Sequence, residues 1–453
     1  MDKFSRFSKN DLLSIAIALL TFTIFMFMFK YLTIFDGLEN STINTRFYLR
    51  DPSQKSDKIQ EGVRKTVRND RANKDLVILG IDEETLRKFD QDHIQWPFPW
   101  KTHAQFTRFV ASGNPSAIMF DIMFESHKEG QDEFAKAIGD SKCTFLDYQF
   151  LSEETDTMYP DQEERLNILD RMKFKVDPND KTNQWVDEVL PPNPIVADKA
   201  KAIGFANILP DADHFNRKMP LLIKYKGFYY PNIDLVVIMN YYGITADDVE
   251  IRMGKYIKLK NIPLEKMTRP NKERAITIPI DETGFMYINF IGQIGSFPHF
   301  PYYFFAQNGS MEGNDSLKGK IAMVAAYTIG MATDVHKSPY GDMFGIEHHA
   351  NALNTILNQD FIIKLTDNEN ILIMLGIALL LGYLLSRLSI ISSIVFTLFL
   401  IIGYSVSNYI LFDLKNIILA LSTPLMMIGT NFALITSFRL LTEQREKRYI
   451  RQT

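Results

Sequence analysis

Apolar residues are concentrated at the two ends of the chain, whereas the long segment between them is polar and mixed. Residues 12–35 form an almost unbroken apolar run in which Lys30 is the only charged side chain. Because about 20 apolar residues are enough to cross the hydrocarbon core of a bilayer, this run predicts a membrane-spanning helix. A cleavable signal peptide is the alternative, but bulky Phe and Tyr residues stand where a small-residue cleavage site would be needed.

Three further apolar segments near the C-terminal end predict three more spanning helices, at residues 370–386, 389–411 and 416–438. Lysine and arginine residues precede the first span, in residues 1–11, and follow the last one, in residues 439–453. Because positively charged flanks remain in the cytoplasm, we expect both of these end segments there. Buried helices of a soluble protein are the alternative, which the matching charge bias disfavours.

The segment between the spans, residues 36–368, alternates short apolar runs with helix signals. Apolar runs of strand length occur at residues 75–82, 117–121, 144–150 and 320–325. Helices are expected at residues 102–112, 132–138 and 348–359. This alternation predicts an α/β domain with a mixed sheet, attached to an all-α membrane module of four helices.

Two further features subdivide this domain. Residues 222–230 predict a hairpin, and residues 281–284 (DETG) predict a turn between two more strands. Residues 152–199 are rich in Asp, Glu, Asn, Pro and Lys with weak periodicity, so we expect an insertion there.

Composition and charge limit the possible partners. The formal net charge of −4 gives no basic face, so we expect no nucleic-acid partner. The single cysteine, Cys143, excludes an intrachain disulfide and a cysteine-based metal cage. The large domain must therefore be held by its own hydrophobic core, which a segment of this length can supply.

Two pairs of residues are candidates for ligand binding. Asp82 and Asp121 each end a buried strand, and ligands of open α/β sheets bind beyond the carboxyl ends of strands. The alternative, which we favour, is that each carboxylate caps the turn that follows it. Trp96 and Trp100 flank two prolines, and either line a pocket or, in the interpretation we favour, seal one edge of the core.

Histidine and aspartate motifs carry less specific signals. His348 and His349 are adjacent on an expected helix, so they point in different directions and cannot both face one metal. His349 is a candidate pH-sensitive group, with a hydrogen-bonded structural histidine as the alternative. Asp211 and Asp213 precede Arg217, which indicates ion pairing; a calcium loop is the alternative, but its Gly and Glu are missing. We assign no residue to catalysis, a cofactor or a metal.

Eight short motifs follow one another between the first and second spans. They are residues 44–47 (NTRF), 81–86 (IDEETL), 96–101 (WPFPWK), 120–124 (FDIMF), 210–213 (PDAD), 230–232 (YPN), 319–321 (GKI) and 345–351 (GIEHHAN). In this order and between these spans, they resemble the second type of CHASE domain, a sensory extracellular domain associated with cyclases and histidine kinases. Ile94 and the pair Asp213-His214 depart from the glycine-containing positions usual in that family, which puts a shared loop geometry or ligand in doubt.

The resemblance implies a membrane-anchored sensor for an unknown extracytoplasmic ligand, in a bacterial plasma membrane and in a homodimer. The residues that we expect to contact the ligand are Asp82, Trp96, Trp100, Asp121, Asp334 and His349. The residues that we expect to transmit the signal, in a linker helix after the last span, are Phe438, Leu441, Arg445 and Arg448.

The resemblance also implies a cytoplasmic effector, in the same chain or a separate one, most often a class III adenylate or guanylate cyclase. Residues 440–451 resemble the lead-in to such a cyclase, but the paired metal-binding carboxylates of a cyclase domain are not among the 453 residues. We therefore expect no cyclic-nucleotide synthesis by these residues, and Mg²⁺ or Mn²⁺ only as a cofactor of a cyclase domain outside them. The alternatives are an extracytoplasmic metal-assisted hydrolase that uses Asp82 and Asp121, or an envelope scaffold protein.

Overall fold

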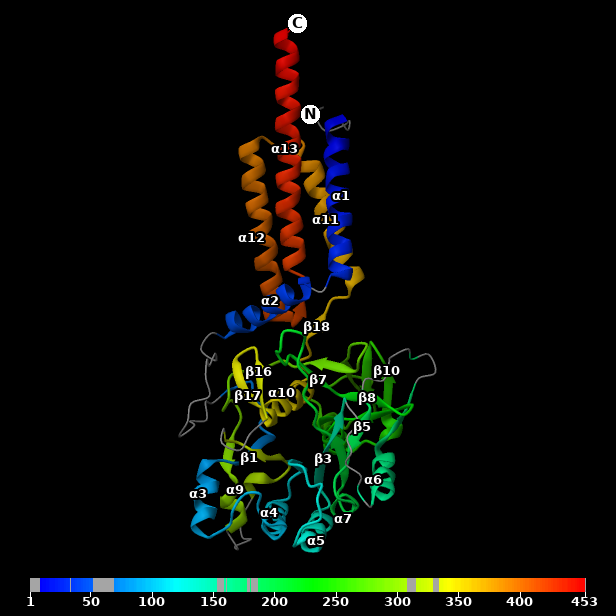
Figure 1. Ribbon diagram of the computed structural model, residues 1–453, viewed down its shortest axis with the longest axis vertical. Coiled ribbons are helices and arrows are strands. Elements are labelled where there is room, and N and C mark those ends of the chain that lie inside the picture. Colours follow the sequence, from blue (N-terminus) through cyan, green and yellow to red (C-terminus); the bar gives the residue numbers. More distant parts are fainter. Residues whose placement is uncertain are drawn as a thin grey trace. The chain divides into compact units, whose positions relative to one another are not determined.

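The computed structural model describes residues 9–32, 34–51, 69–152, 159, 161–176, 180, 186–307, 315–328 and 334–452 (Figure 1). The chain divides into two compact units. The first unit comprises Met1–Arg50 and Ile362–Thr453, and the second comprises Asp51–Phe361. Of the predicted cytoplasmic N-terminal segment, residues 1–8 lie outside the described residues.

The first unit contains the apolar helices that the sequence predicts. Among the described residues, four helices are long and apolar enough to cross a membrane: α1 (Lys9–Tyr31), α11 (Asp367–Leu385), α12 (Ile390–Lys415) and α13 (Ser422–Gln452). They bury a core of small and apolar side chains that includes Ala18, Leu381 and Ile435. Side chains such as Phe399, which is 72% exposed, point away from that core, as lipid-facing side chains would.

The helix boundaries differ from the predicted ones for local reasons. The run at residues 12–35 is interrupted, because α1 ends at Tyr31 and a second, amphipathic helix, α2 (Ile34–Arg50), begins. At the other end, Asn416 closes α12 with a left-handed backbone (φ +54°), and β19 (Ile417–Ile418) pairs in parallel with β18 (Ile363–Lys364). The last apolar helix therefore begins at Ser422 and continues without a break through the predicted linker.

The second unit is built on a seven-stranded mixed sheet, which confirms the predicted α/β fold with a mixed sheet. Its strands run in the order β14 (His299–Pro301), β1 (Leu76–Ile81), β15 (Ile321–Ala326), β2 (Ala117–Asp121) and β3 (Thr144–Leu151), all parallel. β3 also pairs in parallel with β6 (Ala202–Phe205) and in antiparallel with β5 (Glu188–Leu190). The four buried strands predicted from apolar runs are β1, β2, β3 and β15.

Helices cover both faces of this sheet (Figure 1). One face packs against α3 (Glu83–Gln91), α4 (Trp100–Ser112), α5 (Gln131–Ser141) and α9 (Tyr302–Gln307). The other carries α8 (Ile233–Tyr242) and α10 (Gly345–Leu357). Because side chains alternate along a strand, Val77, Leu79 and Ile81 enter the first core, while the intervening Leu76 and Ile78 are buried on the second face.

Smaller sheets complete the second unit. β8 (Leu222–Tyr225) and β9 (Phe228–Pro231) form the predicted hairpin, which β4 (Phe174–Lys175) extends. The predicted turn is present, because the amide of Gly284 (φ +88°) donates to the carbonyl of Asp281 at 3.0 Å. Its flanking strands nevertheless pair elsewhere: β12 (Ile276–Pro279) with β11 (Tyr256–Leu259), and β13 (Phe285–Tyr287) with β7 (Lys218–Pro220).

The predicted insertion is partly integrated into the fold. In its described part, α6 (Gln162–Leu169) and α7 (Pro194–Ala197) are helical, and β5 adds an antiparallel strand to the main sheet. Residues 153–158, 160, 177–179 and 181–185 of this segment lie outside the described residues. The polar composition of the segment hid these short elements, which depend on pairing with distant strands.

A close approach between β6 and α8 fixes the start of α8. A Cβ atom at Gly204 would lie 2.5 Å from backbone atoms of Ile233, so no side chain fits there. Gly204→Ala should destabilise the protein by about 1–3 kcal/mol through overpacking, measured as a lower thermal unfolding midpoint. Gly139→Ala in α5 is the matched control, because its Cβ would meet only the Lys199 side chain at 3.7 Å. Equal midpoints for the two variants would contradict this account.

Candidate functional site

Three of the six predicted ligand residues lie apart from the others. Asp82 is the N-cap of α3, where its Oδ1 accepts from the amide and the hydroxyl of Thr85, both at 2.8 Å. Trp100 is 3% exposed and packs edge-on against Phe124 at 5.5 Å. Trp96 is partly buried against the same core. Capping and core sealing, the alternatives favoured from the sequence, are therefore what these residues do structurally.

The other three, Asp121, Asp334 and His349, come together on the α8/α10 face of the sheet. They form an acid–histidine cluster with three residues that the sequence analysis did not single out. Its members are Asp121, Asp147, Asp234, Asp334, His336 and His349, from β2, β3, α8, the β16 hairpin strand (Val335–Ser338) and α10. Residues far apart in the sequence are thus brought together on the face of the sheet that carries α8 and α10.

A buried ion pair lies at the centre of the cluster. Nδ1 of His349 lies 3.0 Å from both carboxylate oxygens of Asp234, and neither side chain is exposed. The side-chain amide of Asn232, the N-cap residue of α8, donates to Oδ2 of Asp234 at 3.1 Å. Burial alone would lower the pKa of His349, but the charges of Asp234, Asp121 and Asp334 raise it to about 10. The imidazole is therefore a cation at neutral pH.

Two further carboxyl groups of the cluster have raised pKa values. Burial, opposed by the charge of His349, raises the pKa of Asp121 to about 7. Burial and the charge of Asp121 raise the pKa of Asp147 well above its ordinary value. Oδ2 of Asp121, Oδ1 of Asp147 and Nε2 of His349 are buried and have no hydrogen-bond partner among the described residues. Such atoms carry a desolvation cost and commonly mark a functional position.

The rim of the cluster is accessible to solvent. Asp334 is half exposed, and its Oδ1 lies 2.5 Å from Nε2 of His336. Burial opposes ionisation of Asp334, but His336 and the neighbouring histidines hold its pKa below the ordinary value. Burial, together with His336, lowers the pKa of His348 to about 3, so this imidazole is neutral while the adjacent His349 is charged.

This buried arrangement is better suited to binding and releasing protons than to catalysing a reaction in an open cleft. The hydrolase alternative uses Asp82 and Asp121, but Asp82 caps α3 and is not part of the cluster, and His349 at the centre of the cluster has no exposed surface. Within the described part of the chain, no group of three or more His, Cys, Asp or Glu side chains is arranged to hold a metal ion. Asp211 and Asp213 instead bind the buried guanidinium of Arg217, at 2.8 and 2.6 Å.

The predicted signal residues all lie on α13. Phe438, Leu441 and Arg445 lie on the C-terminal half of this helix, and Leu441 and Arg445 are exposed. Arg448 is also on α13, but its side chain lies outside the described residues. Glu39 of α2 contacts the start of α13, and this contact was not predicted because the sequence did not indicate a separate helix α2.

Comparison with known proteins gives one match. The family model of the CHASE2 domain matches residues 16–384, which is most of the chain and includes the acid–histidine cluster. No curated protein and no solved structure matches the chain.

The buried pair should dominate the pH dependence of folding in this unit. Because the pKa of His349 is raised, its stabilisation is complete below the unfolded-state pKa of about 6.5 and is lost as pH rises toward 10. Asp234→Asn and His349→Gln should each cost about 3–5 kcal/mol at neutral pH, because each leaves a buried partner unpaired. The double variant should cost less than their sum and lose stability less steeply above about pH 6.5.

Chemical denaturation at several pH values tests this expectation. His93→Asn is the control, because His93 is exposed and adopts a left-handed backbone (φ +59°) that Asn accepts. A double variant with the same pH profile as the wild type would show that the pair does not couple folding to pH.

Proposed function

Because the chain belongs to the CHASE2 domain family, we propose that it is the sensory input module of a transmembrane signalling system. The second unit detects an extracytoplasmic stimulus, and the first unit carries the response across a bacterial plasma membrane. The four apolar helices are the spans of this arrangement, with both ends of the chain cytoplasmic. CHASE2 is a family of sensory domains, which supports sensing over the hydrolase and scaffold alternatives.

One observation carries the proposal: a carboxylate on α2 holds the start of α13. Glu39 Oε2 accepts from the backbone amides of Leu421 and Ser422, at 2.8 and 2.9 Å, and from the Ser422 hydroxyl at 2.9 Å. Its Oε1 accepts from Arg46 at 2.8 Å. The side chain of Glu39 is about 10% exposed. A carboxylate beside the first amides of a helix is favoured by the helix dipole, so α2 and the start of α13 are held together.

α2 is also attached to the end of α12. Arg50 donates to the carbonyl of Phe412 and to the side chain of Asn416 at 3.0 Å, and lies 3.4 Å from Asp413. Phe47 packs edge-on against Phe412, with ring centroids 5.0 Å apart. α2 directly precedes the second unit in the chain and contacts two of the spanning helices. A shift of α2 would therefore be transmitted to α12 and α13 together.

A second set of polar contacts holds the opposite ends of the helices. Asp11 on α1 accepts from Ser386 at 2.6 Å and from Arg387 at 2.9 Å, in the loop between α11 and α12. Arg439 of α13 donates to the carbonyls of Leu385 and Leu388, both at 2.6 Å. α13 is continuous from the Glu39 contact, past Arg439, to its basic C-terminal turns. We infer that displacement of the first turn of α13 moves the C-terminal end of the same helix.

The output is a cytoplasmic effector, in the same polypeptide or a separate one. A class III adenylate or guanylate cyclase fits best, because residues 440–451 resemble the helix that leads into such enzymes. Their active sites form between two chains, so a homodimer of this module is part of the proposal, as is Mg²⁺ or Mn²⁺ in the cyclase. Ligand binding shifts output only if the ligand prefers one of two helix arrangements.

A cyclase fusion tests the coupling without knowledge of the stimulus. Residues 1–453 are placed before a class III cyclase domain, and cyclic nucleotide is measured in cells that lack other cyclases. Asp121→Asn replaces an ionisable group of the cluster with a neutral amide and should change output several-fold, within the range of about 5–150-fold typical of coupled sites. Glu39→Gln should abolish the effect of Asp121→Asn, because it weakens the contact between α2 and α13.

Ser41→Ala is the matched control, since Ser41 lies on the exposed side of α2. This variant should leave the effect of Asp121→Asn unchanged. If Asp121→Asn alters output equally in the Glu39→Gln background, the signal does not pass through Glu39. If Asp121→Asn has no effect in the wild-type fusion, the second unit is not the input.

A further inference from the structure

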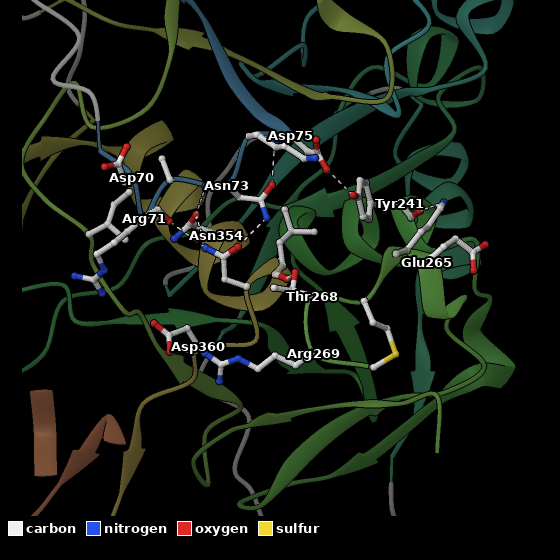
Figure 2. A pocket seen from close by; sticks show the side chains of 17 residues that line it. Asp70, Arg71, Asn73, Asp75, Tyr241, Glu265, Thr268, Arg269, Asn354 and Asp360 are labelled. Carbon is white, nitrogen blue, oxygen red and sulfur yellow. Dashed lines mark hydrogen bonds and ion pairs between the residues drawn. The ribbon is translucent and has the colours of Figure 1, made fainter. Parts of the chain in front are cut away.

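A cavity of about 680 Å³ lies within the second unit, and its lining residues are different from those of the acid–histidine cluster (Figure 2). Two of its walls are the first segment that the structure describes after Asp51 and the segment with which the unit ends. Residues 70–75 lead into β1, and residues 354–360 follow from α10 toward Ile362, where the first unit resumes. The remaining walls are residues 265–269 and Tyr241. The volume is in the range of small-molecule sites.

Asparagine side chains join the two walls. The backbone amide of Asn73 donates to Oδ1 of Asn354 at 2.7 Å, and the side chain of Asn73 donates to Oδ1 of Asn358 at 2.8 Å. Asn358 donates in turn to the carbonyl of Arg71 at 3.1 Å. This network lies at the centre of the labelled side chains in Figure 2. The cavity is therefore preformed, which lowers the ordering cost of binding a ligand.

Several polar groups in the cavity have no protein partner. Asn354 is 3% exposed, yet its Nδ2 donates to no described residue. Neither the Lys74 ammonium nor the Glu265 carboxylate has a partner among the described residues, and Arg71 makes only a long contact of 3.4 Å to Asn289. Because Nδ2 of Asn354 has no partner among the described residues, it is available to donate to a polar acceptor on a ligand.

The charges of the cavity lining are balanced in number. Its lining has four acidic side chains (Asp70, Asp75, Glu265 and Asp360) and four basic ones (Arg71, Lys74, Lys266 and Arg269). Figure 2 shows Arg71 on one side and Tyr241 with Glu265 on the other, with the asparagines between them. The Tyr241 hydroxyl donates to Asp75 at 2.7 Å, so a second carboxylate lies on the Glu265 side. A balanced lining of this kind disfavours polyanions and free cations.

We propose that this cavity binds a zwitterion of the amino-acid class, a free amino acid or a short peptide. The ligand carboxylate lies toward Arg71 and the side-chain amide of Asn354, and the ligand ammonium lies toward Glu265 and Asp75. If the proposed sensory function holds, the ligand bridges residues 70–75 and the last segment of the second unit. Both segments continue in the chain toward the first unit, so occupancy would bias the positions of α2 and α11.

Calorimetric titration of the full chain in lipid nanodiscs tests the binding alone. Unblocked trialanine and the standard free amino acids are the probes, and N-acetyl-trialanine amide is the uncharged control. At least one zwitterion should bind, and the blocked peptide should not. Arg71→Met and Glu265→Gln should each weaken binding of that zwitterion about tenfold, the equivalent of about 1.4 kcal/mol. Lys136→Met, on an exposed part of α5, should leave binding unchanged.

Thermal unfolding midpoints equal to the wild type would show that these variants fold. The proposal is overturned if none of the zwitterions binds, if the blocked peptide binds equally well, or if both cavity variants bind like the wild type. Because the titration needs no effector, it is independent of signalling. If a zwitterion binds but does not change the cyclic-nucleotide output of the cyclase fusion, the sensory function is contradicted. If Asp121→Asn changes that output but no zwitterion binds, only the ligand assignment is contradicted.

Discussion

Glu39 is the constraint on which the arrangement of the first unit depends. A carboxylate that is about 10% exposed must be matched by donors, and here the donors are Arg46 on its own helix and the first amides of α13. These contacts join a residue near the start of the chain to a helix near its end. Because α13 is continuous over 31 residues, a change at its first turn can move its last. The proposed transmission of the signal depends on the contact between Glu39 and the start of α13.

The second unit contains two polar features with different roles. The acid–histidine cluster is closed to solvent at His349, and burial raises the pKa values of its Asp121 and Asp147 carboxyl groups, so its charge depends on pH. The cavity is preformed and charge-balanced, which suits a ligand. α10 connects them, since His349 lies on its first half and Asn354 on its second. Binding in the cavity and protonation of the cluster are therefore expected to affect each other through one helix.

Sequence patterns were sufficient where the signal was continuous and local. The apolar runs predicted the four long helices and the strands β1, β2, β3 and β15, and the motif order predicted the family. The patterns failed where contacts between residues distant in the sequence determine the structure. α2 has a mixed composition and follows an apolar run with only a short break, so it was merged into its neighbours. Asp147 was a visible signal, a lone carboxylate within an apolar strand, whereas nothing local in Asp234 indicates that it pairs with His349.

Accessibility of engineered cysteines in right-side-out membrane vesicles tests the central claim most directly. Cys143 is replaced by Ser, and single cysteines are placed at Lys136 in the second unit and at Glu443 on α13, both exposed positions. A membrane-impermeant maleimide should label Lys136→Cys in intact vesicles and Glu443→Cys only after lysis. Equal labelling of both positions in intact vesicles would place the second unit and the C-terminal end of α13 on the same side of the membrane and contradict a transmembrane sensor.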